Sequence, residues 1–250
     1  MDKLHKNGDF DSPEQTILHG QLIKEKPFLN KLYHDWYKFL LNRINIFPDG
    51  RILELGSGGG FLKKLLPDVI TSDIIDLPSN DMTFSAENMP FENNSLSAIF
   101  MIDVLHHIPN CKAFFSEAQR TLKLGGMVIM SEPANTILSR FFYQNFHHEN
   151  FDPSGGWKIE DSTGPLSGAN GAIPWIVFKR DVDIFHKEYP NLRLEIVQLH
   201  SPLMYFLSGG LSHNQLVPSF TYNFFKGIEK LLTPLNSLIG MFQLIVVKKI

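Results

Sequence analysis

Short apolar runs alternate with segments of helical spacing through the first half of the chain. "RILEL" (51–55) predicts a buried strand, the glycines after it predict a turn, and "GFLKKLL" (60–66) predicts a short helix that ends at Pro67. Further strands are predicted in "DVITSDI", "DMTFSA", "LSAIFMID" and "MVIMSEP", and a helix in "NCKAFFSEAQRTLKLGG", which Gly125 and Gly126 close. Strands that alternate with helices favour a parallel sheet covered on both faces.

Before and after this region, the regular alternation of apolar runs and helical segments is absent. A polar leader precedes "KPFLNKLYHDWYKFLLNRI" (26–44), where apolar residues recur at helical spacing. Beyond Pro133 we expect a helix in "TILSRFFYQNF", a polar, glycine-rich stretch at 147–174, and a helix in "RDVDIFHKEY" that Pro190 ends. "LRLEIVQL" and "MFQLIVVKK" are strand candidates, and the segment between them, 202–240, is too long for a hairpin turn.

Composition narrows the class of protein. The chain has 250 residues, 43% hydrophobic and 20% charged, with a net charge of -3, which is typical of one folded domain and lacks the basic excess of nucleic-acid-binding proteins. The single Cys111 forms no internal disulfide and the polar opening is unlike a secretory signal, so we expect a cytoplasmic protein. The apolar runs are too short for a transmembrane helix, while the Phe- and Leu-rich C-terminal third leaves contact with a membrane surface open.

The glycine-rich turn after the first strand indicates a ligand that approaches the backbone closely. Gly56, Gly58, Gly59 and Gly60 follow a strand, a context used for nucleoside triphosphates, dinucleotides and S-adenosylmethionine. A P-loop would need Gly-Lys followed by Ser or Thr, which this chain lacks. A dinucleotide fingerprint would need glycine where Phe61 stands, which weakens that alternative but leaves it open.

Two acids flank this turn and help to choose among the ligands. Glu54 stands just before it, where a carboxylate would repel a pyrophosphate and attract an ammonium or sulfonium group. Asp73 ends the second predicted strand 17 residues after Gly56, close to the offset of about 20 at which an acid binds ribose hydroxyls. The pattern favours an adenosine ligand that carries positive charge; the alternative is an ordinary turn with two solvated acids.

At these residues the chain resembles the class I S-adenosylmethionine-dependent methyltransferases, in particular their small-molecule, type 11 branch. The resemblance rests on "ILELGSGGGFL", "SDI", "AENMPFENNSLSAI", "DVLHHIP" and "TLKLGGMVIMSEP", in the family's order over about residues 25–135. It implies an α/β, Rossmann-like three-layer sandwich with a mostly parallel seven-stranded sheet, an antiparallel final strand and helical insertions in the C-terminal half. We therefore expect one methyltransferase domain, with a leader and lid helix at 1–45, the cofactor-binding core at 46–135, and acceptor-side insertions with the final two strands at 136–250.

The resemblance also implies the residues that bind S-adenosylmethionine. The acid and glycines of the turn would line the methionine end, Asp73 would hold the ribose hydroxyls, and Ile74 would pack on the adenine. Ser85 stands where family members often have an acid for the adenine amino group, and Asp103 where they contact the cofactor's reactive end. The full predicted set is Glu54, Gly56, Ser57, Gly58, Gly60, Asp73, Ile74, Ser85, Ala86 and Asp103.

A hydroxyl or amine acceptor must lose a proton, which calls for a general base. His107 is the favoured candidate and His106 the second, because their loop follows the fourth strand at the carboxyl edge of the sheet. Further candidates are Glu132 and the run His147, His148 and Glu149. No metal is predicted, since the chain has no cysteine cluster and no helical i, i+4 histidine pair. Tyr33, Trp36 and Tyr37 would belong to a lid or simply pack on the sheet.

The acceptor is expected to be a small molecule, with a sugar or a lipid-linked glycan as a hypothesis. The segment 202–240 contains Tyr205, Phe206, Phe220, Tyr222, Phe224 and Phe225, which suggest an acceptor-side cap or a membrane-facing surface. Two other functions remain open: a non-catalytic S-adenosylmethionine-binding regulatory or scaffold protein, and a nicotinamide-dependent oxidoreductase.

Overall fold

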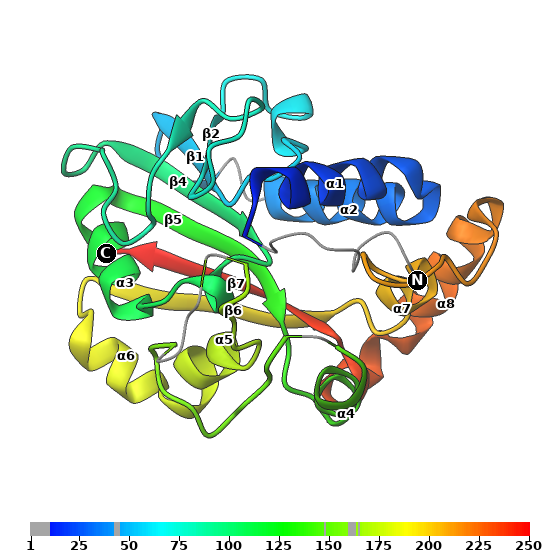
Figure 1. Ribbon diagram of the computed structural model, residues 1–250. Helices are drawn as coiled ribbons and strands as arrows, with labels where there is room; N and C mark the ends of the chain where they lie inside the picture. Colours follow the sequence, from blue (N-terminus) through cyan, green and yellow to red (C-terminus); the bar gives the residue numbers. More distant parts are fainter. Residues whose placement is uncertain (1–10, 43–45, 148, 160–163, 165) are drawn as a thin grey trace.

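Seven strands form one sheet within the residues that the computed structural model describes, 11–42, 46–147, 149–159, 164 and 166–250. They are β1 (Arg51–Leu55), β2 (Ile70–Asp73), β3 (Met82–Thr83), β4 (Leu96–Ile102), β5 (Leu122–Pro133), β6 (Leu192–His200) and β7 (Phe242–Lys249). Their order is β3-β2-β1-β4-β5-β7-β6, and β7 runs antiparallel to both of its neighbours while the other pairs are parallel. In Figure 1, β5 and the red β7 point in opposite directions. The predicted fold class is confirmed.

Both faces of the sheet are buried, which explains why its strands read as continuous apolar runs. In β4, Ala98 and Phe100 join one hydrophobic cluster, while Ile99 and Met101 join the cluster on the other face. Tyr37 of helix α2 (Pro27–Leu41) packs in the first cluster, and helices α3 (Cys111–Thr121) and α6 (Val182–Glu188) contribute to the second. The molecule is therefore a sandwich of three layers.

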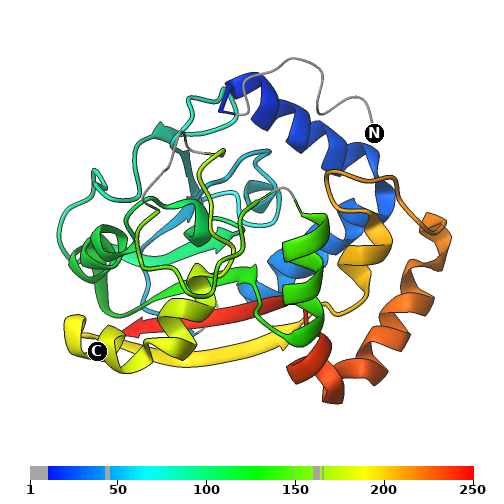
Figure 2. The same ribbon diagram turned by 60° about the horizontal axis from the view of Figure 1, so that its bottom comes forward.

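The remaining helices surround the carboxyl end of the sheet. They are α1 (Pro13–Glu25), α4 (Ile137–Phe146), α5 (Ile173–Trp175), α7 (Met204–Ser208), α8 (Tyr222–Leu232) and α9 (Asn236–Ile239). Figure 2 shows α4 beside the orange and red segment that contains α7, α8 and α9. In the described part of the chain, no helix is both long enough and apolar enough to cross a membrane.

Three elements differ from the sequence prediction. The helix that Gly125 and Gly126 were expected to close ends earlier, at Thr121, and β5 begins at the next residue, Leu122. The segment expected to be a polar leader contains α1, which Ser12 caps through a hydrogen bond from Gln15 N, with Pro13 in its first turn. The helix expected after the glycines is a single 3-10 turn, Leu62–Lys64. The reason is that the turn extends to Gly60 with positive φ angles and Pro67 follows soon after, so few residues are left for a helix.

Candidate active site

A cavity of about 540 Å³ opens where the parallel strands end. The residues that follow β1, β2 and β4 line it, as expected for ligand sites in open α/β sheets. Its volume lies within the range of about 300–1,000 Å³ that is common for pockets that bind small molecules. The predicted residues that line it are Gly56, Ser57, Gly58, Asp73, Ile74, Ser85, Ala86, Asp103, His106 and His107.

The glycine turn brings bare backbone to the cavity wall. Gly56 and Gly58 have φ angles of +65° and +46°, which disfavour other residues. A Cβ atom on Gly56 would lie 2.4 Å from the side chain of Val104, so this position has no room for one. A Cβ atom on Gly58 would meet nothing nearer than Thr16, 3.8 Å away, so its backbone faces open space. Ser57 anchors the turn, because its hydroxyl accepts a hydrogen bond of 3.1 Å from Ser72 N.

Asp73 links β2 to this turn and also lines the cavity. Its carboxylate accepts hydrogen bonds from Gly58 N at 3.1 Å and from Ile75 N at 3.2 Å. Burial raises the pKa of the Asp73 carboxyl, although these backbone donors oppose the shift. The carboxylate is thus held in place with acceptor capacity remaining for a ligand.

Glu54 and Gly60 differ from the prediction, because neither lines the cavity. Glu54 points beneath the turn and is only 2% exposed. Burial raises the pKa of the Glu54 carboxyl to about 7, while hydrogen bonds from the hydroxyls of Tyr37 and Ser57 oppose that rise. In β1, Glu54 stands between the buried residues Leu53 and Leu55. Its side chain is therefore buried, as theirs are, in the core.

Asp103 lies on the cavity wall in a strained backbone conformation. Its φ angle is +56°, which is uncommon for a residue other than glycine, and its N–H donates a hydrogen bond of 3.0 Å to Ser131 O. Burial raises the pKa of the Asp103 carboxyl to about 8; His106 opposes the rise, and Glu132 and Glu149 add to it.

Two histidines and two glutamates form a polar cluster on the wall. His106 Nδ1 lies 2.7 Å from Glu132 Oε2, and His106 Nε2 lies 3.3 Å from Glu149 Oε2. Burial alone would lower the pKa of His106, but the two carboxylates raise it well above its usual value. His107 Nε2 lies 3.6 Å from Glu149 Oε1, and burial lowers the pKa of His107 to about 4. His148, another predicted candidate, lies outside the described residues.

Comparison with known proteins agrees with this geometry. A family model described as "Methyltransferase domain" matches residues 53–130, the segment that holds the turn, Asp73 and both histidines. This match over about a third of the chain supports the expected resemblance to the class I S-adenosylmethionine-dependent methyltransferases.

A curated relative and two solved structures resemble this chain. The sterol 24-C-methyltransferase erg6 of Schizosaccharomyces pombe is 26% identical over 135 residues, which cover 45% of this chain and 35% of that protein, so the match spans about a third of the relative. The geranyl diphosphate C-methyltransferase of Streptomyces coelicolor, in complex with Mg²⁺, geranyl diphosphate and S-adenosyl-L-homocysteine, is 13% identical with a TM-score of 0.50, over 98% of this chain and 86% of that one. A SAM-dependent methyltransferase of Thermotoga maritima is 17% identical with a TM-score of 0.50, over 92% and 99%. At these identities the two structures show a common fold.

S-adenosylmethionine is the cofactor of the matched family, and the cavity of this chain fits it. The open space at Gly58 leaves room for the methionine portion beside bare backbone. The Asp73 carboxylate can accept hydrogen bonds from two ribose hydroxyls. Ile74, which is 49% exposed, offers an apolar surface for the adenine. The family match argues against the nicotinamide alternative.

Helix α1 supplies part of the cavity wall that the sequence analysis missed. Thr16, His19, Gly20 and Ile23 of this helix line the wall opposite the strands. Gly20 permits a close approach, since a Cβ there would lie 3.1 Å from the Cα of Gly59. The capped Ser-Pro start of α1 was the available sequence signal, but nothing in the sequence placed the helix over the cavity.

The predicted lid and cap are only partly present. Tyr33 and Tyr37 of α2 line the cavity, whereas Trp36 packs in the core and its Nε1 donates a hydrogen bond of 2.9 Å to Ser201.

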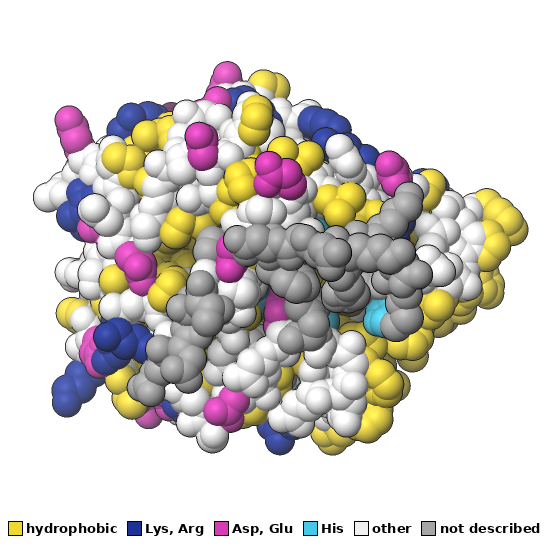
Figure 3. Space-filling model, viewed as in Figure 1, with side chains coloured by type: hydrophobic (Ala, Val, Ile, Leu, Met, Phe, Trp, Pro, Cys, Tyr) yellow, Lys and Arg dark blue, Asp and Glu magenta, His cyan; other side chains and the backbone are white. Residues whose placement is uncertain are grey.

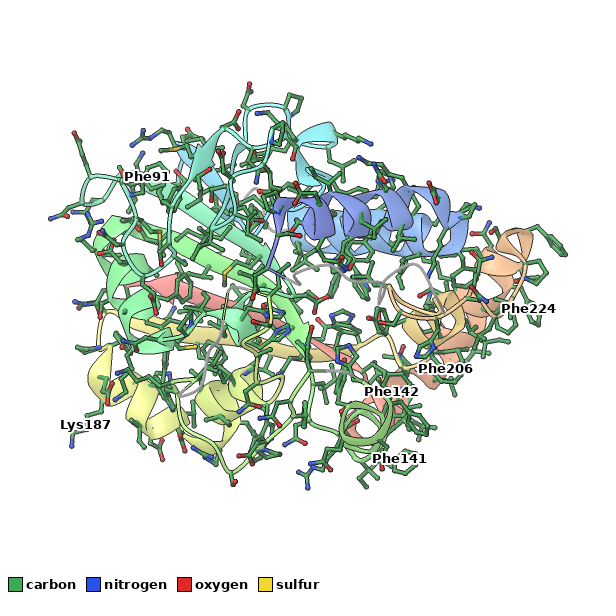
Figure 4. All side chains as sticks on the ribbon, viewed as in Figure 1. Phe91, Phe141, Phe142, Lys187, Phe206 and Phe224 are labelled. Atoms are coloured by element: carbon green, nitrogen blue, oxygen red, sulfur yellow. The ribbon has the colours of Figure 1, made fainter. Side chains whose placement is uncertain are left out.

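In the C-terminal segment, Tyr205 lines the cavity but Tyr222 does not. The Tyr222 ring lies 4.8 Å from that of Phe28, and its hydroxyl donates a hydrogen bond of 2.6 Å to Asp35. The other aromatics also lie away from the wall, and Figure 4 shows Phe206 and Phe224 on the α7–α8 side of the molecule. A cap formed by all six aromatic residues is therefore not what the structure shows.

Proposed function

We propose that this protein transfers the methyl group of S-adenosylmethionine to a small-molecule acceptor. The observation that carries the proposal is a single cavity with two unlike ends: the glycine turn with Asp73, and the cluster of His106, His107 and Glu149. The bound cofactor supplies an electrophilic methyl group on a sulfonium, so the protein needs chiefly to align the acceptor with it and exclude water.

At the cofactor end of the cavity, we assign a role to each predicted lining residue. Asp73 binds the ribose hydroxyls, the backbone of Gly56 and Gly58 contacts the methionine portion, and Ile74 packs on the adenine. Ser85 and Ala86 lie at the adenine end, where the Ser85 hydroxyl accepts a weaker hydrogen bond than an acid would. Asp103 stands at the reactive end, between the turn and the histidine cluster.

The acceptor end contains the groups that activate the acceptor. A hydroxyl or amine must lose a proton during or after transfer, and His106 and His107 are titratable cavity residues three and four positions after the strained Asp103. His107 is the more accessible of the two, with 16% of its side chain exposed against 2% for His106. We assign acceptor activation to the cluster that these histidines form with Glu149.

The acceptor class that we favour is a lipid-linked molecule, with a glycan as its head group. An apolar surface of exposed residues lies on α4, α7, α8, α9 and the short turns before α8 and α9; we call it the apolar rim, and it comprises Phe141, Phe146, Phe206, Phe220, Phe224, Leu231, Leu235 and Leu238. Figure 3 shows hydrophobic side chains gathered on this side of the molecule. Such a surface suits peripheral contact with a membrane that carries the acceptor. The names of the relatives, a sterol and a geranyl diphosphate methyltransferase, are consistent with an apolar acceptor.

Two measurements test the proposal. Calorimetric titration with S-adenosylmethionine, S-adenosylhomocysteine and NAD should show binding of the first two alone. Incubation with methyl-labelled cofactor and separate lipid and sugar extracts should then label the lipid fraction. Binding without labelling of any extract would support the non-catalytic regulatory or scaffold alternative, and binding of NAD alone would overturn the assignment of the cofactor.

A further inference from the structure

Three donor atoms of the histidine cluster face one point on the cavity wall. His106 Nε2 lies 3.3 Å from Glu149 Oε2, and His107 Nε2 lies 3.6 Å from Glu149 Oε1. Donor atoms of the three residues all lie within 4.8 Å of one another. Two ligands bound tetrahedrally at about 2.0–2.1 Å from Zn²⁺ are about 3.4 Å apart. The two distances to Glu149 therefore match the spacing around a single ion, while the third pair of donors, at most 4.8 Å apart, must close slightly around it.

Hydrogen bonds determine which nitrogen of each ring faces that point. His107 Nδ1 lies 3.3 Å from the carbonyl oxygen of Gly168, which can only accept, so Nδ1 carries the hydrogen. His106 Nδ1 likewise faces a carboxylate oxygen of Glu132 at 2.7 Å. In a neutral ring, Nε2 then carries a lone pair directed at Glu149. In histidines that bind metal ions, one ring nitrogen usually donates a hydrogen bond to a carboxylate or carbonyl oxygen, and the other nitrogen coordinates the ion.

The two glutamates are themselves held in position. Glu132 Oε1 accepts hydrogen bonds from Val104 N at 2.9 Å and Leu105 N at 2.8 Å, which leaves Oε2 for His106. The backbone N–H of Glu149 donates to His147 Nδ1 at 3.3 Å. The protein thus fixes the Glu132 carboxylate and the backbone of Glu149, which lowers the cost of ordering a site when an ion binds.

We propose that His106, His107 and Glu149 bind one divalent metal ion of the Zn²⁺ type. Two imidazole nitrogens and one carboxylate are the ligand set of many catalytic zinc sites, whereas Mg²⁺ prefers oxygen ligands alone. This inference departs from the sequence prediction of no metal, since the donors come from separate segments that only the fold unites.

All three proposed ligands line the cavity, so a fourth coordination position would face the space where the acceptor would bind. This role rests on the proposed function, whereas binding of the ion does not. An acceptor hydroxyl or amine on the ion becomes more acidic and loses its proton to solvent. The lone pair that remains forms the bond to the methyl carbon as the carbon–sulfur bond breaks.

The test measures binding of Zn²⁺ to protein prepared without a polyhistidine tag and stripped with a chelator. Calorimetry should show one Zn²⁺ per chain and no binding of Mg²⁺ at the same concentrations. X-ray absorption of the zinc-loaded wild-type protein should show two imidazoles at about 2.0–2.1 Å. A zinc coordination shell that contains no imidazole would overturn the proposal, whatever affinity for Zn²⁺ the substituted proteins show.

Substitutions locate the site. Loss of a ligand in His107→Gln or Glu149→Gln should weaken Zn²⁺ binding by more than about 100-fold, while His186→Gln, on the exposed surface of α6, should leave it unchanged. Glu132→Gln tests the positioning of His106. The new amide nitrogen can only donate to Nδ1, which forces the ring hydrogen onto Nε2 and should weaken binding by about 10–100-fold. Equal affinity of wild type, His107→Gln and Glu149→Gln for Zn²⁺ would overturn the proposal.

S-adenosylmethionine binding serves as the control for folding, because other residues build the cofactor end. A variant that binds the cofactor but has lost Zn²⁺ supports the site. Zinc binding by the cluster in a protein that does not bind S-adenosylmethionine would uphold the metal site and refute the proposed function. Cofactor binding and methyl transfer without any zinc binding would uphold the proposed function and refute the metal site.

Discussion

At the scale of single residues, burial of Glu54 makes the stability of this protein depend on pH. The pKa of its carboxyl rises from 4.5 to about 7 in the folded state. Between these values the folded protein binds more protons than the unfolded chain, so the free energy of unfolding contributed by this group falls as pH rises. The contribution is fully present below about pH 4.5 and is lost above about pH 7.

We predict that Glu54→Gln removes this dependence. Because the amide does not ionise, the stability of the variant relative to wild type should increase from pH 5 to pH 8, by on the order of 2–3 kcal/mol. Urea denaturation at several pH values measures the difference without ligand. Glu92→Gln, at an exposed position, should show a flat difference, and the same flat result for Glu54→Gln would contradict the burial argument.

Asp73→Ala should weaken S-adenosylmethionine binding by about 1.5–3 kcal/mol, or about 10- to 150-fold in Kd, because the ribose loses its charged hydrogen-bond acceptor. Calorimetry measures the change. Asp76→Ala, at an exposed position three residues further along, is the matched control and should bind the cofactor as wild type does. The assignment of the ribose to Asp73 is wrong if a folded Asp73→Ala protein keeps the wild-type Kd.

At the scale of elements, helix α1 depends on one glycine for its position over the cavity. A Cβ on Gly20 would lie 3.1 Å from the Cα of Gly59, which belongs to the turn itself. A Cβ on Gly227 of α8 would meet nothing within 4 Å, so the two helices offer a matched pair of glycines.

We predict that Gly20→Val displaces α1 from the turn and weakens cofactor binding by about 1–3 kcal/mol, or about 5- to 150-fold. Gly227→Val introduces the same side chain into a helix and should leave cofactor binding unchanged. Titration of both variants, alongside thermal melts, separates the two effects. Equal cofactor affinity of the two variants would show that α1 does not form part of the cofactor site.

At the scale of the whole molecule, the apolar rim lies on the side of α7 and α8 and includes the most exposed aromatic side chains. Phe220 is 86% exposed and Phe224 is 66% exposed. Lys226 and Lys230 lie on the same helix as Phe224, where cations would attract an anionic lipid surface.

We predict that Phe220→Ser combined with Phe224→Ser lowers binding to phosphatidylglycerol-containing vesicles by at least about 10-fold, because less apolar surface inserts. Cofactor affinity should not change, since neither residue lines the cavity. Leu124→Ser, which removes a residue that is 73% exposed on β5, is the control. Cosedimentation measures binding, and an equal loss with Leu124→Ser would exclude the apolar rim as the membrane contact.

Strands and helices with a clear pattern of apolar residues could be predicted from the sequence. Contacts between residues far apart in the sequence could not. The strands β1, β4 and β5 were evident because each carries apolar residues toward both faces of the sheet. The charge of Glu54 predicted contact with a positively charged ligand, whereas the structure buries its side chain in β1, where it stands between the buried residues Leu53 and Leu55. Tyr222 was assigned to a cap from composition alone, yet it packs on Phe28 of α2.

The sequence by itself determined the fold class and was enough to predict a cofactor end of the site. Both depend on local signals: the alternation of strands and helices, the glycines that need positive φ angles, and the acid that ends the next strand. Only the tertiary structure decided the acceptor end, where His106, His107, Glu132, Glu149 and Gly168 meet. These residues lie on separate segments, and packing of the segments against the sheet, which no local pattern encodes, fixes the distances between them.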